Sequence, residues 1–91
     1  MADPRAALAG LVPAVLALEG VSVVETSADY LHATVTSRLF GFIDDLELHA
    51  ESGRGVLEAR SVSRLGDSDL GVNAQRLAIL RQALDTSSPS L

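Results

Sequence analysis

Asp44 and Asp45 are adjacent carboxylates and the most obvious candidates for catalysis in this chain of 91 residues. A general acid–base pair must place both carboxylates near the same reacting group. The two aspartates lie in a segment that alternates like a β-strand, which directs neighbouring side chains to opposite faces. We therefore predict no catalytic pair, with Asp45 on an open face and Asp44 on the core face. A buried carboxylate needs a partner, and Arg38 or Arg76 could supply a structural ion pair.

The segment 66–71, which is glycine, serine and aspartate apart from Leu70, leads into the last predicted helix. The start of a helix offers amide groups to a phosphate or carboxylate, and Arg38 and Arg64 could add positive charge. The aspartates of the segment oppose an anion and can cap the amides themselves, so Ser68 or Asp69 is expected as the helix cap. The segment does not fit a calcium-binding loop, because its glycine is misplaced and the closing glutamate is missing.

Three further polar residues are expected beneath the last helix. Ser61 and Ser63 lie on or near the core face of the fourth predicted strand, and Asn73 falls on the inward face of the helix. They could bind a ligand, but buried polar groups usually find protein partners. We therefore predict that Asn73 ties the start of the helix to the fourth strand.

His32 and His49, with Glu47, are the side chains that could hold a metal ion, since the chain has no cysteine. The two histidines fall in neighbouring rows of the open face without the spacing of a metal motif, so we predict no metal site. The sequence also lacks a Ser-His-Asp arrangement, a phosphate loop and a nucleotide fingerprint. We predict neither a cofactor nor a catalytic residue.

The net charge of −5 argues against nucleic acid or an anionic membrane as the main partner. All seven basic residues are arginine, which forms two-pronged pairs with carboxylates and phosphates, although a GC-rich genome gives the same bias. No apolar run approaches the roughly 20 residues that a membrane span needs. The first residues do not resemble a signal peptide, so a cytoplasmic location is expected for the chain as given.

These residues must be positioned by a helix, four strands and a second helix. Asp3 and Pro4 suit the N-cap and first turn of the opening helix. Pro13 is expected to bend this helix or to confine its regular part to the second half, and Gly20 is expected to end it. The strands are predicted from alternating apolar and polar residues at 21–26, 30–37, 42–50 and 56–63.

Charge predicts the register of the strands, because like charges directly opposite each other are unfavourable. A four-residue loop between the last two strands places Glu47 opposite Arg60 and His49 opposite Glu58. His32 then joins Glu47 and Arg60 in one row. The apolar pairs predicted between the second and third strands are Leu31 with Leu48 and Ala33 with Leu46.

The predicted fold is α+β: a helix, a four-stranded antiparallel meander and a helix, with both helices on one face of the sheet. We expect one domain over residues 1–86 and a disordered tail over 87–91. The apolar residues expected on the covered face are Leu31, Leu46, Leu48 and Leu57 from the sheet and Leu70, Leu77, Leu80 and Leu84 from the last helix.

The open face is predicted to carry more apolar and aromatic surface than a solvated face requires, which often marks a contact site. Its members are Val24, Tyr30, His32, Thr34, Ile43, Asp45, His49, Arg60 and Val62. The valine-rich first strand is a second candidate, as an exposed sheet edge. Both features indicate association, as a homodimer or with a larger protein.

Five blocks with characteristic spacing lie between residues 30 and 76. They are Tyr-Leu-His-Ala at 30–33, Ser-Arg-Leu-Phe-Gly-Phe at 37–42, Asp-Asp-Leu-Glu at 44–47, Arg-Ser-Val-Ser-Arg at 60–64 and Gly-x-Ser-Asp-Leu-Gly-Val-Asn-x-x-Arg at 66–76. Together they resemble domain-of-unknown-function family 1499, whose biochemical function is not established. Members often carry an upstream Cys-Val-Ser-Ser motif, sometimes behind a membrane or lipid anchor, and an aromatic residue at the position of Asp67; this sequence has neither. Plant and cyanobacterial relatives imply a photosynthetic context, with export or plastid targeting in some members.

The expected function is a non-enzymatic interaction or accessory module that binds a protein through the open face or an arginine-rich rim. The alternative is a small-ligand domain or enzyme that holds a carboxylate or phosphate at Arg38, Arg64 and the start of the last helix. The candidate residues are Arg38, Asp44, Asp45, Glu47, Arg60, Ser61, Ser63, Arg64, Ser68, Asp69, Asn73 and Arg76, with Tyr30, His32, Ile43 and His49 on the open face.

Overall fold

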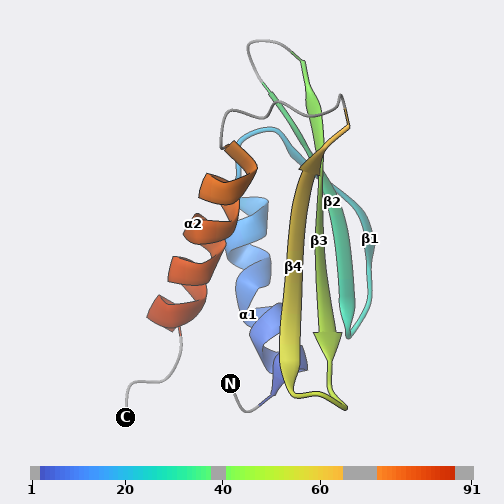
Figure 1. The fold of residues 1–91 in the computed structure, drawn as a ribbon, viewed down its shortest axis with the longest axis vertical. Coiled ribbons are helices and arrows are strands. Elements are labelled where there is room, and N and C mark those ends of the chain that lie inside the picture. Colours follow the sequence, from blue (N-terminus) through green and yellow to red (C-terminus); the bar gives the residue numbers. More distant parts are fainter. Residues whose placement is uncertain (1–2, 38–40, 65–71, 88–91) are drawn as a thin grey trace.

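The computed structural model describes residues 3–37, 41–64 and 72–87. Its elements are α1 (Pro4–Leu16), β1 (Val21–Thr26), β2 (Tyr30–Thr36), β3 (Ile43–Glu51), β4 (Val56–Ser63) and α2 (Val72–Ser87). The predicted α+β order of helix, antiparallel meander and helix is confirmed (Figure 1).

The four strands form one antiparallel sheet in the order β1-β2-β3-β4. Glu47 lies opposite Arg60 and His49 lies opposite Glu58, as the charges predicted. His32 lies opposite Glu47 and completes the predicted row. The apolar partners across β2 and β3 are also those predicted, namely Leu31 with Leu48 and Ala33 with Leu46.

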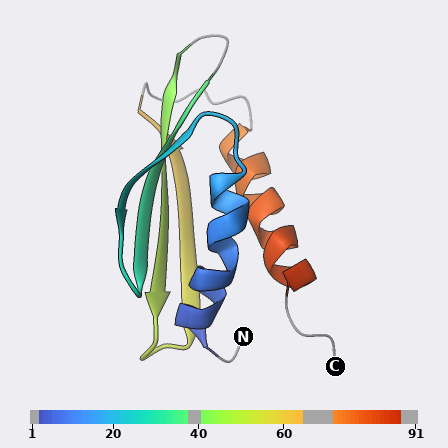
Figure 2. The ribbon, with the colours of Figure 1, turned by 180° about the vertical axis from the view of Figure 1, so that it is seen from behind.

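Both helices lie on the same side of the sheet (Figures 1 and 2). Every second residue of β2 and β3 is buried over most of each strand, because these strands lie in the middle of the sheet beneath the helices. Full burial of one leucine side chain contributes about 1.5–3 kcal/mol. The core consists of Leu8, Leu11, Val15, Leu31, Ala33, Leu46, Leu48, Ala50 and Leu80.

The first helix keeps regular geometry on both sides of Pro13, so the prediction that its regular part is confined to the second half is wrong. The side chain of Asp3 caps it and accepts from the Arg5 amide at 3.0 Å. A proline removes a single backbone hydrogen bond. Burial of Leu8 and Leu11 before Pro13 and of Val15 after it holds the helix together.

The helix ends at Leu16, earlier than the predicted stop at Gly20. The Ala17 amide donates to the carbonyl of Pro13 at 3.0 Å and closes the last turn. Gly20 instead forms the turn into β1, with a positive φ of 79°. A side chain there would place its Cβ 2.2 Å from the carbonyl oxygen of Thr36, so glycine is required by close approach of the backbone.

The first strand forms one edge of the sheet and is poorly covered. Its register with β2 shifts between Val23 and Glu25, which places a bulge at Val24. Val23 lies opposite the buried Ala33, yet it is 39% exposed. The helices therefore cover β2 and β3 more completely than β1.

The second helix packs its leucine face on the core as predicted, with Leu80 buried and Leu77 and Leu84 partly buried. The predicted caps and Leu70 fall within 65–71, outside the described residues. The helix extends to Ser87, one residue into the predicted tail. Within the described part of the chain, no helix is long and apolar enough to cross a membrane.

Candidate functional site

Five polar side chains meet between α2 and the sheet, and we call them the buried polar cluster. They are Asp44 of β3, Ser61 and Ser63 of β4, and Asn73 and Arg76 of α2. Asp44 lies opposite Ser63 in the β3–β4 ladder. Asn73 and Arg76 are three residues apart and share one side of the helix. Strand alternation and helical spacing thus direct all five side chains to one place.

Arg76 is the centre of this cluster. Its Nη1 donates to Asp44 Oδ2 at 2.9 Å, to Ser61 Oγ at 3.0 Å and to Asn73 Oδ1 at 2.7 Å. Arg76 and Asp44 are each only 8% exposed, so either charge would be strongly unfavourable without the other. Of the two arginines predicted as partners for Asp44, Arg76 forms the pair, and Arg38 lies outside the described residues.

Asn73 ties α2 to β4, as predicted. The hydroxyl of Ser61 donates to Asn73 Oδ1 at 2.6 Å, and Asn73 Nδ2 donates to Ser63 Oγ at 3.0 Å. Among the described residues, no buried side-chain nitrogen or oxygen lacks a hydrogen-bond partner. The cluster therefore satisfies its own polar groups, which is typical of a network that fixes the packing of a core.

Asp45 binds two basic side chains on the opposite face of the sheet. Its Oδ2 accepts from Arg64 Nε at 2.8 Å and its Oδ1 from Arg64 Nη2 at 2.9 Å, while His32 Nε2 lies 2.7 Å from Oδ1. The hydrogen bonds from Arg64 first, and His32 second, hold the pKa of Asp45 well below its usual range. Asp44 and Asp45 thus lie on opposite faces, as predicted, and cannot share a proton.

Tyr30, Glu47 and Arg60 continue this polar network across three strands. The Tyr30 hydroxyl donates to Glu47 Oε2 at 2.5 Å, and this bond raises the pKa of Tyr30 to about 12 because a phenolate would face the carboxylate. Arg60 Nη1 lies 3.6 Å from Glu47 Oε1, which confirms the predicted pair. The Tyr30 ring packs edge-on against His49, with ring centroids 6.2 Å apart.

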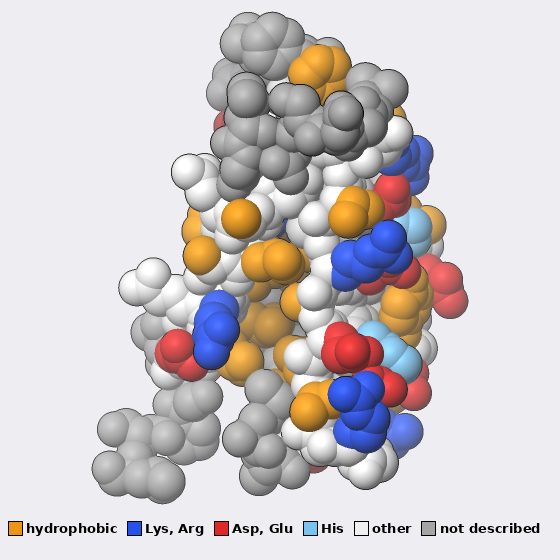
Figure 3. All heavy atoms as spheres, viewed as in Figure 1, with side chains coloured by type: hydrophobic (Ala, Val, Ile, Leu, Met, Phe, Trp, Pro, Cys, Tyr) orange, Lys and Arg blue, Asp and Glu red, His pale blue; other side chains and the backbone are white. Residues whose placement is uncertain are grey.

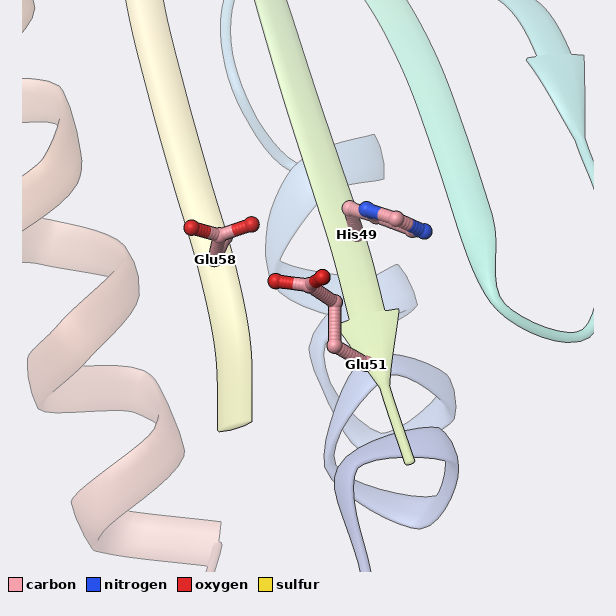
Figure 4. Close-up of side chains that lie close together, drawn as sticks. All are labelled: His49, Glu51 and Glu58. Carbon is pink, nitrogen blue, oxygen red and sulfur yellow. The ribbon is translucent and has the colours of Figure 1, made fainter. Parts of the chain in front are cut away.

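His49, Glu51 and Glu58 lie together near the β3–β4 turn, and we call them the hairpin cluster (Figure 4). One nitrogen or oxygen from each residue lies within 4.8 Å of the others. The adjacent Glu51 carboxyl raises the pKa of Glu58. Arg54 Nη1 lies 2.7 Å from Glu51 Oε2 and 3.8 Å from Glu58 Oε2. The Arg54 guanidinium lies near both carboxylates, so we assign the cluster as an ion-pair network.

The histidines do not converge on Glu47. His32 binds Asp45, whereas Glu47 binds Tyr30. The sequence predicts His49 opposite Glu58 but not Glu51 beside them, because the predicted third strand ends one residue before Glu51.

Comparison with known proteins identifies the family but no reaction. The model of a family described as "Protein of unknown function (DUF1499)" matches residues 1–84, nearly the whole chain. The chain belongs to the DUF1499 family. No curated protein and no solved structure matches it significantly. In this DUF1499 domain, all five residues of the buried polar cluster lie within the sequence blocks described above.

The proposed anion site of the DUF1499 domain is only partly described. Arg64 is bonded twice to Asp45. Arg38, Ser68 and Asp69 lie outside the described residues. Arg64, the one residue of this proposed site that the structure describes, therefore binds a carboxylate of the protein itself.

The outer side of β4 is a feature that the sequence did not indicate. The Arg64 amide donates to the carbonyl of Ile43 at 3.0 Å. Because ladder bonds alternate along an antiparallel pair, the register directs the backbone of every odd-numbered β4 residue away from β3. These residues are Leu57, Ala59, Ser61 and Ser63, and we call their outward N–H and C=O groups the β4 edge. No described strand pairs with this side of β4.

An apolar margin accompanies the β4 edge. Leu57 and Ala59 lie on the core side of the sheet, opposite buried residues of β3, yet Leu57 is only partly buried and Ala59 is exposed. Figure 3 shows apolar side chains in a hollow between α2 and β4. Leu77 and Leu84 of α2 are likewise only partly buried against the core. We call these four side chains the apolar furrow.

Proposed function

We propose that this DUF1499 domain is a non-enzymatic protein-interaction module that binds its partner along β4. The observation that carries the proposal is that a row of outward backbone groups and an incompletely covered part of the core lie on the same strand. A strand added to a sheet edge gains main-chain hydrogen bonds, and side-chain pockets add specificity. The β4 edge offers the main-chain hydrogen bonds, and the apolar furrow offers a place for the partner's side chains.

The polar side chains support an interaction module over a small-ligand site. Arg64 is engaged by Asp45, and Arg76 is engaged by Asp44 within the core. A carboxylate or phosphate ligand at either arginine would have to displace an existing ion pair. Removing one partner of a buried pair is unfavourable by about 3–5 kcal/mol, which disfavours such an exchange at Arg76.

The β4 edge is better suited to strand addition than the β1 edge suggested by the valine content. The bulge at Val24 interrupts β1, and bulges of this kind discourage pairing at an edge. The β3–β4 register is continuous from Ser63 to Val56. A partner strand can therefore follow β4 without a break.

The open face of the sheet borders the proposed binding surface along β4. Glu58 and Arg60 project from β4 on that side and are largely exposed. Val62, on the same side, is 38% exposed. The centre of the face carries the ion pairs of Asp45 and Glu47, as a solvated surface does.

Substitution of Ala59 tests this proposal. Ala59→Pro removes the outward N–H and leaves the bonds between β4 and β3, because proline is tolerated where an edge amide faces solvent. Ala59→Val is the matched control, since it keeps the amide and favours a strand. Ala59→Asp is a second blocking variant that keeps the amide but places a charge beside the furrow. Circular dichroism establishes which variants remain folded.

Each immobilised protein would be exposed to an extract of the source cells, and the retained proteins identified. We expect wild type and Ala59→Val to retain the same proteins, further copies of this chain included, and the blocking variants to lose them. Identical retention by all four proteins would contradict binding along β4. Retention of nothing, with thermal stabilisation by phosphate or citrate, would favour the small-ligand alternative.

A further inference from the structure

The β4 edge is regular enough to pair with the same edge of a second copy. Two identical strands related by a two-fold axis run antiparallel, and each residue then contacts its symmetry-related partner. The outward backbone groups of one copy must face those of the other. The two registers with the greatest overlap of Val56–Ser63 are centred on Ala59 and on Arg60.

Charge selects between these two registers. With the axis at Ala59, Glu58 of each copy lies opposite Arg60 of the other, and symmetry forms this pair twice. With the axis at Arg60, two arginines lie opposite each other. Opposite charges across a ladder are favourable and like charges are unfavourable. The backbone of Glu58 and Arg60 faces β3, so the new pairs occupy non-hydrogen-bonded positions, where facing side chains approach most closely.

Both charges remain accessible to a second copy. The Arg60 side chain is 70% exposed and lies 3.6 Å from Glu47. The Glu58 side chain is 55% exposed, lies 3.8 Å from Arg54 and has the Glu51 carboxyl beside it. A second arginine next to Glu58 would offset the repulsion between these two carboxylates.

The Ala59 register also covers apolar surface. It brings Ala59 of the two copies together and places Leu57 opposite Ser61 on the core side of the sheet. The two apolar furrows then lie next to each other at the junction. On the open side, Val56 faces the partly exposed Val62.

We propose that two copies of this chain join through β4 about a two-fold axis at Ala59, forming one continuous sheet of the two four-stranded sheets. This inference rests on the proposed function and names its partner as a second copy of the chain. The outward backbone groups of β4 allow this register, and the opposite charges of Glu58 and Arg60 favour it.

Sedimentation equilibrium of the full chain tests the self-pairing. The monomer mass is 9.5 kDa, and we expect the weight-average mass to approach twice that value as concentration rises. Glu58→Arg and Arg60→Glu each place like charges opposite, twice in the dimer, and each should weaken dimerisation about tenfold or more. The double variant E58R/R60E restores opposite charges and should recover the dimer. Circular dichroism checks each fold, because residue 60 also faces Glu47.

A mass of 9.5 kDa at every concentration would overturn the self-pairing. A dimer that tolerates both single reversals, or a folded double variant that stays monomeric, would overturn the Ala59 register. The Ala59→Pro variant adds a test independent of charge, since it should be monomeric. A monomeric wild type that retains another protein in an Ala59-dependent manner would leave the proposed function standing without self-pairing. A wild type that is monomeric and retains no protein in an Ala59-dependent manner would contradict both the self-pairing and the proposed function.

Discussion

Arg76 of α2 reaches Asp44 of β3 with Nη1 2.9 Å from Oδ2, and the two residues are 32 positions apart in the sequence. Both side chains are buried, and Arg76 Nη1 also donates to the hydroxyl of Ser61 in β4. It therefore fixes where α2 lies along the sheet. Since α2 forms one wall of the apolar furrow, this buried pair also positions the surface that we assign to binding.

Asp44→Ala should destabilise the domain far more than Glu47→Ala. The first change leaves the buried Arg76 without its carboxylate, which should cost about 3–5 kcal/mol. The second removes a pair with the largely exposed Arg60, which contributes about 0–1 kcal/mol, and the hydrogen bond from Tyr30, which contributes about 1 kcal/mol. Urea unfolding of both variants measures the difference. Equal losses would show that Asp44 is not buried in a fixed ion pair.

Asn73→Ala should lower stability although alanine is the better helix former. Its side chain bonds Ser61 and Ser63, and buried partners left unpaired cost about 1–3 kcal/mol. Thermal and urea unfolding check this value, with Gln75→Ala on the exposed side of α2 as the control. A melting temperature for Asn73→Ala at or above that of wild type would contradict the role of Asn73 as a link between α2 and β4.

Tyr30 should ionise only at high pH, and its ionisation tests the hydrogen bond to Glu47 directly. It is the only tyrosine in the chain, so the absorbance change of phenolate formation belongs to it alone. We expect a midpoint near pH 12 in the folded protein. Glu47→Gln should lower the midpoint toward the ordinary value of about 10, whereas Glu25→Gln, which alters a weaker electrostatic contribution, should lower it less. A wild-type midpoint near the ordinary value, with the fold intact, would contradict the hydrogen bond.

Asp45 should make stability depend on acid pH. Its pKa is lowered in the folded state by Arg64 and His32, so the unfolded chain binds the proton more readily. The stabilisation is therefore complete above the unfolded value of about 4 and is lost as the pH falls toward the lower folded value. Asp45→Asn should flatten the decline in unfolding free energy below about pH 4. Parallel curves for wild type and Asp45→Asn would exclude this linkage.

The sheet could be predicted because two independent sequence patterns agree on it. Alternation assigns Leu46 and Leu48 to one face, and the charges of Glu47, Glu58 and Arg60 allow one register for the hairpin. The same alternation separates Asp44 from Asp45. The buried polar cluster was therefore largely predictable, apart from the choice of Arg76 as the partner of Asp44.

The surface along β4 could not be predicted in the same way. Leu57 and Ala59 have the alternation of core residues, but their exposure depends on how far two helices extend across the sheet. Helix placement is a tertiary property that no local pattern encodes. The end of α1 at Leu16 also depends on tertiary structure. The turn at Gly20 that follows it is set by the close approach of Thr36 from β2.

Amide hydrogen exchange, followed residue by residue as protein concentration rises, tests the central claim most directly. The amides of Glu58 and Arg60 face β3 and should be protected at every concentration. Those of Leu57 and Ala59 face outward and should exchange rapidly in dilute protein and become protected as the dimer forms. Protection of these two amides that does not change with concentration, or their rapid exchange in a sample shown to be dimeric, would contradict pairing along β4.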